Sequence, residues 1–412
     1  MTSTPLRING DRLMRRLMAL AQVGAIDGGG VCRLALTDED RAGRDLVVRW
    51  MRELGLSVTI DRIGNVVGTR VGTSHSKPVI IGSHIDTVRT GGKYDGNLGV
   101  LAGLEVIETL NDAKVVTGHP IAVAFFTNEE GSRFAPDMMG SAVHQGALSL
   151  ETALGTKGID GATVGDELNR IGYAGETPVG TLRAAAYFEL HIEQGPVLER
   201  EGLEIGAVTG VQGISWTEVT LRGVSNHAGT TPMSMRVDAG YVAAEIACFL
   251  RRLSREYGGS QVATVGHVTF APNLVNVIPN HVVMTLDLRN TDEATLQKAE
   301  KAAFDFVDET AKAEGVQATR RTLARFEPVD FAPEMIDRVE QTARSQGLSV
   351  RRMPSGAGHD AQMFAPHCPT GMIFVPSQGG ISHNIREFTE PAQLIAGANV
   401  LLEVVQQTAR VD

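Results

Sequence analysis

The sequence has little cysteine and no long apolar run, and both absences narrow the class of protein. Its three cysteines, Cys32, Cys248 and Cys368, lie far apart in a chain of 412 residues and form no Cys-x-x-Cys pair. Such a small, odd number predicts no disulfide framework and favours a reducing compartment. No apolar stretch approaches the roughly 20 residues that a membrane-spanning helix needs. We therefore expect a cytoplasmic protein with no membrane partner.

Positive charge is also scarce relative to negative charge. The chain has 38 Lys and Arg against 48 Asp and Glu, a net charge of -10. This balance argues against nucleic acid or an anionic membrane surface as the main partner. The first twenty residues, MTSTPLRINGDRLMRRLMAL, scatter charges among apolar positions. They predict an amphipathic helix rather than a signal peptide.

The first half of the chain alternates strand-like and helix-like segments. Residues 77–86 (KPVIIGSHID) and 119–130 (HPIAVAFFTNEE) predict buried strands, and residues 99–110 (GVLAGLEVIETL) have helical spacing. Strand, helix, strand in this order predicts an α/β fold with a largely parallel sheet. Functional sites in such sheets gather where the strands end, and polar clusters follow both predicted strands.

The pattern changes near residue 211. Residues 215–229 alternate apolar and polar side chains, residues 263–290 predict two antiparallel strands that turn at Pro279-Asn280, and two amphipathic helices are predicted over 236–258 and 293–315. We predict an inserted α+β domain at 211–328. The outer, catalytic domain is then discontinuous, with a first part at 1–210 and a second at 329–412.

Histidines and carboxylates follow the predicted strands. They are His84 and Asp86 in GSHIDT, Asp95 in KYDGN, Glu129 and Glu130 in TNEEG, His191 in FELHIEQGP and His383 in GISHN. A single histidine is more often a core or surface residue than a ligand, and a single Asp-Gly is more often a turn. Together they favour a metal site, since imidazole and carboxylate are common zinc ligands. GNLGVLAG lacks the order of a dinucleotide-binding loop.

Nine segments together resemble one family. They are GSHIDTV, GGKYDGNLGVLAGLEV, FTNEEGSRF, ELHIEQGPVLE, SNHAGTTPM, NVIPN, LDLRN, SGAGHDAQMF and ISHN, which run from about residue 80 to residue 384. The chain resembles the dinuclear-metal amidohydrolases that act on carbamoyl groups: N-carbamoyl-L-amino acid hydrolases, β-ureidopropionases and allantoate amidohydrolases. The resemblance implies a zinc-aminopeptidase-like α/β/α catalytic domain, a ferredoxin-like dimerisation domain and a homodimer.

The resemblance also implies two divalent metal ions per subunit, with zinc the first expectation and manganese, cobalt and nickel left open. His84 and His191 would hold one ion and Glu130 and His383 the other, with Asp95 between them. Asp86 would orient His84. Glu129 would be the general base that takes a proton from the attacking water and passes it to the leaving nitrogen. The alternative for the glutamate pair is a solvated turn with two surface acids.

Five further residues are implied as substrate contacts. His227 would stabilise the oxyanion, across a dimer interface. Arg289 would clamp a substrate carboxylate. The others are Asn276 for the same end of the substrate, Gln194 for the ureido group and Gly358 for backbone contacts. Arg289 could instead be a surface ion-pair residue, and His359 and Asp360 could be structural; His359 is a poorer ligand candidate than His383.

The implied reaction is hydrolysis of the carbamoyl C–N bond of an N-carbamoyl amino acid, giving the amino acid, carbon dioxide and ammonia. β-Ureidopropionate and allantoate remain alternative ureido substrates. Ile214 stands where several relatives carry Gln, which weakens the allantoate alternative modestly. A dipeptidase or deacylase of the same fold is a more distant alternative. A non-catalytic binding protein is disfavoured, because all five ligand candidates and Glu129 are present.

Overall fold

The computed structural model describes residues 5–410. Two compact units are separated by their internal contacts: an outer unit, Met1–Thr209 with Asp330–Asp412, and an inserted unit, Gly210–Val329. Within the described residues, none of the helices has both the length and the apolar character that crossing a membrane requires.

The outer unit is built on a mixed sheet. Its strand order is β1-β2-β4-β3-β5-β13-β6-β11, with β12 paired to β6. β4, β3, β5 and β13 are parallel, whereas β1 pairs antiparallel with β2, β2 with β4, and β6 with β13. The largely parallel sheet predicted from the sequence is therefore limited to the four central strands. The bounds are β1 Ser57–Ile60, β2 Val66–Arg70, β3 Val79–His84, β4 Ile121–Phe126, β5 Ala186–Ile192, β6 Ile205–Val211, β11 Val329–Asp330, β12 Val350–Ser355 and β13 Thr370–Val375.

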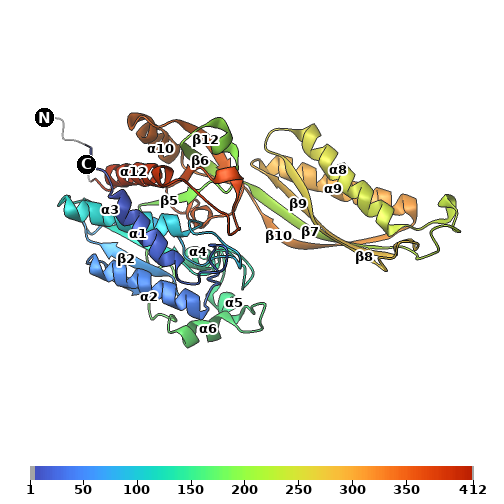
Figure 1. The fold of residues 1–412 in the computed structure, drawn as a ribbon, viewed down its shortest axis with the longest axis horizontal. Coiled ribbons are helices and arrows are strands. Elements are labelled where there is room, and N and C mark those ends of the chain that lie inside the picture. The colour runs from blue at the N-terminus through green and yellow to red at the C-terminus, as the bar shows by residue number, and fades with distance from the viewer. Residues whose placement is uncertain (1–4, 411–412) are drawn as a thin grey trace. The chain divides into compact units, whose positions relative to one another are not determined.

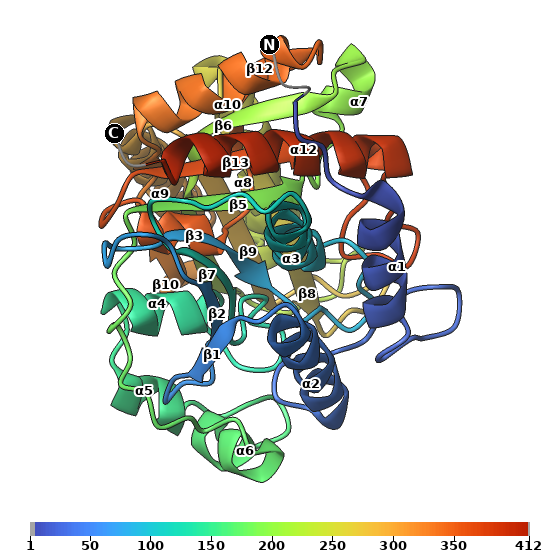
Figure 2. The ribbon, with the colours of Figure 1, turned by 90° about the vertical axis from the view of Figure 1, so that its left-hand side faces the viewer.

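Helices cover both faces of this sheet (Figure 2). Their bounds are α1 Gly10–Ala21, α2 Asp38–Glu53, α3 Asn97–Asp112, α4 Met139–Gln145, α5 Leu150–Gly155, α6 Val164–Ile171, α7 Val197–Glu201, α10 Pro333–Ser345, α11 Asp360–Phe364 and α12 Pro391–Thr408, with a 3-10 turn at Gln378–Gly380. On one face, Gly103 of α3 lies against Val123 and Ile81. On the other, Phe364 of α11 stacks on Tyr187 with ring centroids 4.1 Å apart. This is the expected α/β/α arrangement.

The inserted unit has a four-stranded antiparallel sheet in the order β10-β7-β9-β8 (Figure 1). Its elements run β7 Gly213–Arg222, a 3-10 turn Met233–Met235, α8 Ala239–Tyr257, β8 Val262–Ala271, β9 His281–Asn290, α9 Glu293–Glu314 and β10 Gln317–Phe326. The order βαββαβ is that of a ferredoxin-like domain. Both helices pack on the sheet, and Phe249 of α8 stacks on Phe306 of α9 at 4.0 Å.

The register of the central strands determines where the polar residues meet. β3, β4 and β5 are buried along their whole length, so both of their faces are apolar and covered. His84, the last residue of β3, pairs with Phe126, the last residue of β4. Residues 127–130 therefore leave the sheet beside His84. His191 of β5 leaves at the same edge, because the three strands are parallel.

Candidate metal centre

Two histidines at this edge have their ring orientation fixed by backbone carbonyls. His84 Nδ1 lies 2.9 Å from the carbonyl oxygen of Asp86, and His191 Nδ1 lies 2.9 Å from that of Ile192. A carbonyl only accepts, so each Nδ1 carries the proton and each Nε2 offers a lone pair. His191 Nε2 accepts the backbone N–H of Gly96 at 3.2 Å. Both rings are buried and present Nε2 to the same point.

Asp95 lies at that point, on the loop that leads into α3. Its Oδ1 is 3.6 Å from His84 Nε2 and 3.2 Å from His191 Nε2. Its Oδ2 is 3.4 Å from His383 Nε2. The two oxygens of one carboxylate thus face two separate sets of ligand atoms, as a bridging ligand must.

The second set comes from Glu130 and His383. Glu130 follows β4, and its Oε2 lies 3.3 Å from His383 Nε2. Its other oxygen, Oε1, is buried without a hydrogen-bond partner. Buried carboxylate oxygens without a partner are costly, so this atom is suited to a cation. His383 has a backbone φ of 52° in the loop after β13, and its side chain is 52% exposed.

These residues fit two cations. The ligand atoms of His84, Asp95 and His191 form one compact group, and those of Asp95, Glu130 and His383 form another. A third compact group, Glu189, His191 and His359, reuses His191. The single lone pair of His191 already faces Asp95, and His359 Nε2 lies 2.9 Å from Ser355 Oγ. The third group therefore does not provide a separate set of ligands for a further ion.

The buried carboxylates of the cluster also favour the binding of cations. Burial, reinforced by Asp95, raises the pKa of Glu130 to about 8. Burial likewise raises the pKa of Glu129 well above its ordinary value. Burial opposes ionisation of Asp95 too, but the three histidines around it, His191, His383 and His84, hold its pKa well below the usual range. Adjacent buried carboxylates are tolerated when positive charge lies between them.

Glu129 and Glu130 diverge from one another. Glu129 Oε2 lies 3.3 Å from His84 Nε2, whereas Glu130 Oε2 lies 3.3 Å from His383 Nε2. Glu129 belongs to neither group of ligand atoms. The predicted alternative of a solvated turn does not describe this pair, because Glu129 is buried and both carboxylates face the histidines.

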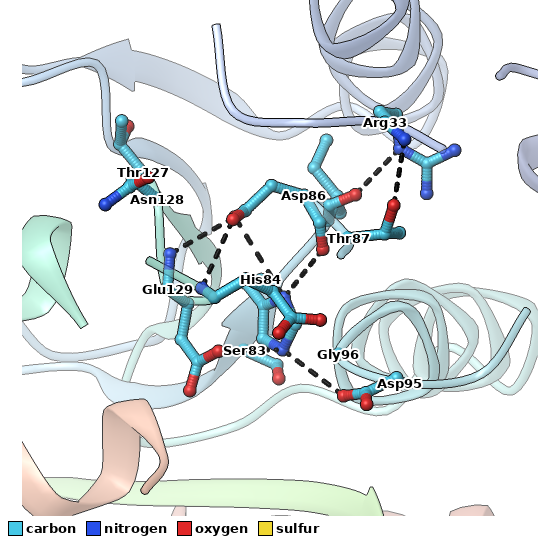
Figure 3. A network of polar contacts seen from close by, with 12 residues as sticks. Arg33, Ser83, His84, Asp86, Thr87, Asp95, Gly96, Thr127, Asn128 and Glu129 are labelled. Atoms are coloured by element: carbon cyan, nitrogen blue, oxygen red, sulfur yellow. Dashed lines mark hydrogen bonds and ion pairs between the residues drawn. The ribbon is translucent and has the colours of Figure 1, made fainter. Parts of the chain in front are cut away.

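Asp86 holds the glutamate backbone rather than the His84 ring. Its Oδ1 accepts the N–H of Glu129 and its Oδ2 the N–H of Glu130, each at 3.3 Å (Figure 3). Its carboxylate is 4.0 Å from His84 Nδ1, which bonds the Asp86 carbonyl instead. β3 ends at His84, so the two residues do not share a strand face. Asp86 therefore orients His84 through its backbone, not through its acid.

Two residues near the cluster, Arg33 and Gly96, have a structural role that the sequence did not predict. Arg33 is fully buried and donates to the carbonyl of Ile85 and to Asn97 Oδ1, each at 2.7 Å, which ties the turn after His84 to the start of α3. Gly96 has a φ of 65°, and a Cβ there would lie 2.4 Å from the His84 ring. Only glycine fits this position.

Gln194 and Gly358 lie in the outer unit. Gln194, expected to contact the ureido group, donates from Nε2 to Asp95 Oδ2 at 2.9 Å. Its Oε1 is buried and unpartnered. Gly358 precedes His359, and a Cβ there would lie 3.0 Å from Met138 Cε.

The remaining substrate candidates lie in the inserted unit. His227 and Asn276 are neighbours, because the N–H of Ala228 donates to the carbonyl of Asn276 at 2.9 Å. Arg289 of β9 donates to both oxygens of Asp287, and its guanidinium lies over the Trp216 ring. The alternative of an ion-pair role for Arg289 thus has a partner in the structure.

Comparison with known proteins agrees with this geometry. The model of Peptidase family M20/M25/M40 matches residues 80–407. An N-carbamoyl-L-amino-acid amidohydrolase of Rhizobium meliloti is 44% identical over 98% of both chains. An allantoate amidohydrolase of Bacillus subtilis is 35% identical over 95% of both. A solved amidase of the hydantoinase/carbamoylase family from Burkholderia multivorans has a TM-score of 0.95 and 46% identity, covering 98% of this chain and 100% of that one.

The chain therefore belongs to peptidase family M20/M25/M40, a class of metal-dependent hydrolases. Within that class its full-length relatives are amidohydrolases, and the predicted enzyme, one that hydrolyses C–N bonds, is confirmed. The predicted resemblance to carbamoyl-directed amidohydrolases and the predicted fold class are confirmed as well.

Proposed function

We propose that this protein hydrolyses the carbamoyl C–N bond of an N-carbamoyl amino acid. One water is consumed, and the amino acid, carbon dioxide and ammonia are formed. The observation that carries the proposal is the shared Asp95, which faces two sets of ligand atoms while Glu129 lies beside it outside both. Full-length similarity to an N-carbamoyl-L-amino-acid amidohydrolase supports the carbamoyl substrate class.

Two divalent ions are part of the proposal. His84 and His191 would hold one and Glu130 and His383 the other, with Asp95 shared. When bound, the ions would supply an activated water and polarise the carbamoyl carbonyl. Zinc is the first expectation, and manganese, cobalt and nickel suit the same nitrogen and oxygen ligands.

Glu129 is the proposed general base. Burial raises the pKa of Glu129, so its carboxylate binds a proton more tightly than an exposed glutamate would, and its Oε2 lies 3.3 Å from His84 Nε2. In the reaction it takes a proton from the attacking water and delivers it to the nitrogen that leaves. The C–N bond then breaks with a neutral nitrogen as the leaving group, and the carbamate that remains decomposes to carbon dioxide and the other nitrogen product.

His227 is proposed as the donor to the oxyanion. Its Nδ1 accepts the N–H groups of Gly229 at 3.0 Å and Thr230 at 3.2 Å. The ring proton is therefore on Nε2, which is the donor that an oxyanion requires. Its neighbour Asn276 would hydrogen-bond the same substrate. Gln194, Gly358 and Arg289 complete the proposed contacts.

Arg289→Ala should weaken turnover of carboxylate-bearing substrates most. A lost charge pair at a binding site costs about 2–5 kcal/mol, which is roughly 30-fold or more in kcat/KM. Kinetics would be compared on an N-carbamoyl amino acid and on its amide, which lacks the carboxylate. Arg289→Lys is the control that retains charge without the planar fork. An equal loss on both substrates would remove Arg289 from this role.

The proposed function is tested by ammonia release from a substrate panel. The panel holds N-carbamoyl-L-amino acids, their D-enantiomers, N-carbamoyl-β-alanine, allantoate and a dipeptide, each assayed with zinc, manganese or cobalt. Release from an N-carbamoyl-L-amino acid above all others is the expected result. Preference for allantoate or the β-alanine compound would move the protein to that substrate, and cleavage of the dipeptide alone would overturn the carbamoyl proposal.

A homodimer is proposed from the edge of the inserted sheet. β8 is the last strand in its order, and several of its apolar side chains are exposed, among them Val268 at 37% and Phe270 at 42%. An exposed apolar edge strand pairs readily with a second copy. The few free cysteines remain the reason to expect this dimer in the cytoplasm.

Phe270→Arg should shift the protein toward monomer. A buried charge without a partner destabilises an apolar interface by several kcal/mol. Light scattering after gel filtration would measure the mass, with Val71→Arg as control, since Val71 is 80% exposed in the outer unit. A wild-type chain that elutes as a monomer would contradict the proposal directly.

A further inference from the structure

Glu387 is a buried carboxylate next to the candidate metal centre that belongs to none of its ligand groups. It is 5% exposed. Its Oε1 accepts two backbone N–H groups, that of Tyr94 at 3.0 Å and that of Asp95 at 3.2 Å. The Glu387 side chain is therefore hydrogen-bonded to the backbone of Asp95, the residue that both groups of ligand atoms share.

The loop that carries Asp95 is shaped to receive this side chain. A Cβ at Gly92 would lie 2.0 Å from Glu387 Oε1 and 2.4 Å from its Cβ, so no other residue fits there. Just before it, Gly91 and Val31 exchange two backbone hydrogen bonds, at 2.9 and 3.0 Å. The loop is thus fixed on one side by Val31 and on the other by Glu387.

Glu387 also reaches the segment that carries His383. Ser382 Oγ donates to Asp95 Oδ2 at 3.0 Å and lies 3.4 Å from Glu387 Oε2. The N–H of Glu387 donates to the carbonyl of Asn384 at 2.9 Å, which closes the turn after His383. One side chain therefore joins two ligand loops that are distant in the sequence.

We propose that Glu387 is a positioning residue that holds the Asp95 loop and the His383 loop in the register needed to bind two metal ions. The inference rests on the proposed dinuclear function. Glu387 itself belongs to neither group of ligand atoms. Hydrogen bonds that orient metal ligands from behind typically change metal affinity 10- to 100-fold when they are removed.

The side chain must combine length with an acceptor oxygen. Glutamine keeps both, because its amide oxygen can accept the N–H groups of Tyr94 and Asp95. Aspartate keeps the charge but withdraws the oxygen by one methylene, and alanine removes it. The order expected for metal affinity is therefore wild type and Glu387→Gln first, with Glu387→Asp and Glu387→Ala below.

The experiment titrates metal-free protein with Co²⁺ in competition with a chromogenic chelator. Wild type and Glu387→Gln should bind two ions with similar affinity, and Glu387→Ala should bind about 10- to 100-fold more weakly. The visible spectrum of the cobalt-loaded protein reports ligand geometry independently of turnover. Asp61→Ala is a matched control, since Asp61 Oδ1 also accepts two backbone N–H groups, from Ile63 and Asn65, in a loop that carries no ligand.

Each outcome has one meaning. Glu387→Ala with wild-type cobalt affinity and spectrum would overturn the inference, even if its unfolding temperature were lower. If Glu387→Ala does not fold, Glu387→Asp decides by the same titration. A wild-type protein that binds no metal would instead refute the proposed function, because there would then be no metal site for Glu387 to position.

Discussion

Glu129→Gln should lower kcat by about 10²–10⁴ while the protein keeps its metal. The amide has nearly the same shape, so the buried position stays filled. It cannot take a proton from water, and the leaving nitrogen is not protonated. Metal content should not change, because Glu129 lies outside both groups of ligand atoms. Steady-state kinetics and elemental analysis of the same preparation measure both quantities.

Glu130→Gln is the matched comparison, one residue along the chain. Glu130 belongs to the second ligand group, so its amide should reduce the bound metal toward one ion per chain. The two variants make the same chemical change in adjacent residues, but Glu129→Gln should lose turnover and keep metal, whereas Glu130→Gln should lose metal. If Glu129→Gln loses metal, or keeps turnover near wild type, the general-base role is wrong.

Removing the metal should abolish ammonia release and destabilise the fold. Each proposed ion would neutralise carboxylates that are otherwise crowded in a buried site. A ligand at 1,000 times its Kd stabilises the native state by about 4 kcal/mol, so its loss should be visible in urea unfolding. Chelator-treated protein, freed of chelator by gel filtration, would be assayed before and after each metal is restored.

The comparison of restored activities also ranks the metals. Zinc, manganese, cobalt and nickel should each recover part of the rate, and the best of them indicates the working ion. Adding back chelator already saturated with metal controls for direct inhibition. The proposal of two metal ions would be refuted if protein that contains no metal by elemental analysis showed full turnover.

The five ligand candidates named from the sequence lie together in the structure, and their binding of metal stays a prediction. His84, Glu130 and His191 follow apolar strands whose ends a parallel sheet brings together, and Asp95 precedes a helix at the same edge. The first five elements of the inserted unit, in the order βαββα, were predicted from their periodicity, whereas the last strand, β10, was not. Strong hydrophobic patterns determine the elements, and the elements determine which residues meet.

Contacts between loops that are distant in the sequence could not be predicted from such hydrophobic patterns. Nothing in the sequence distinguishes Glu387 from a surface glutamate, because its role depends on the backbone of Tyr94 and Asp95. Gln194 was assigned to substrate, and the sequence did not indicate that it also donates to Asp95. The antiparallel outer strands were missed because a short buried strand has the same composition in either direction.

The discontinuity of the outer unit has a consequence for synthesis of the protein. His84, Asp95, Glu130 and His191 are translated before the inserted unit, whereas His383 comes after it. A nascent chain therefore carries all residues of the first ligand group before the second group is complete. In the proposed dinuclear site, the second ion would bind only after the segment with His383 docks beside Asp95. The order of translation would thus set the order in which the two ions can bind.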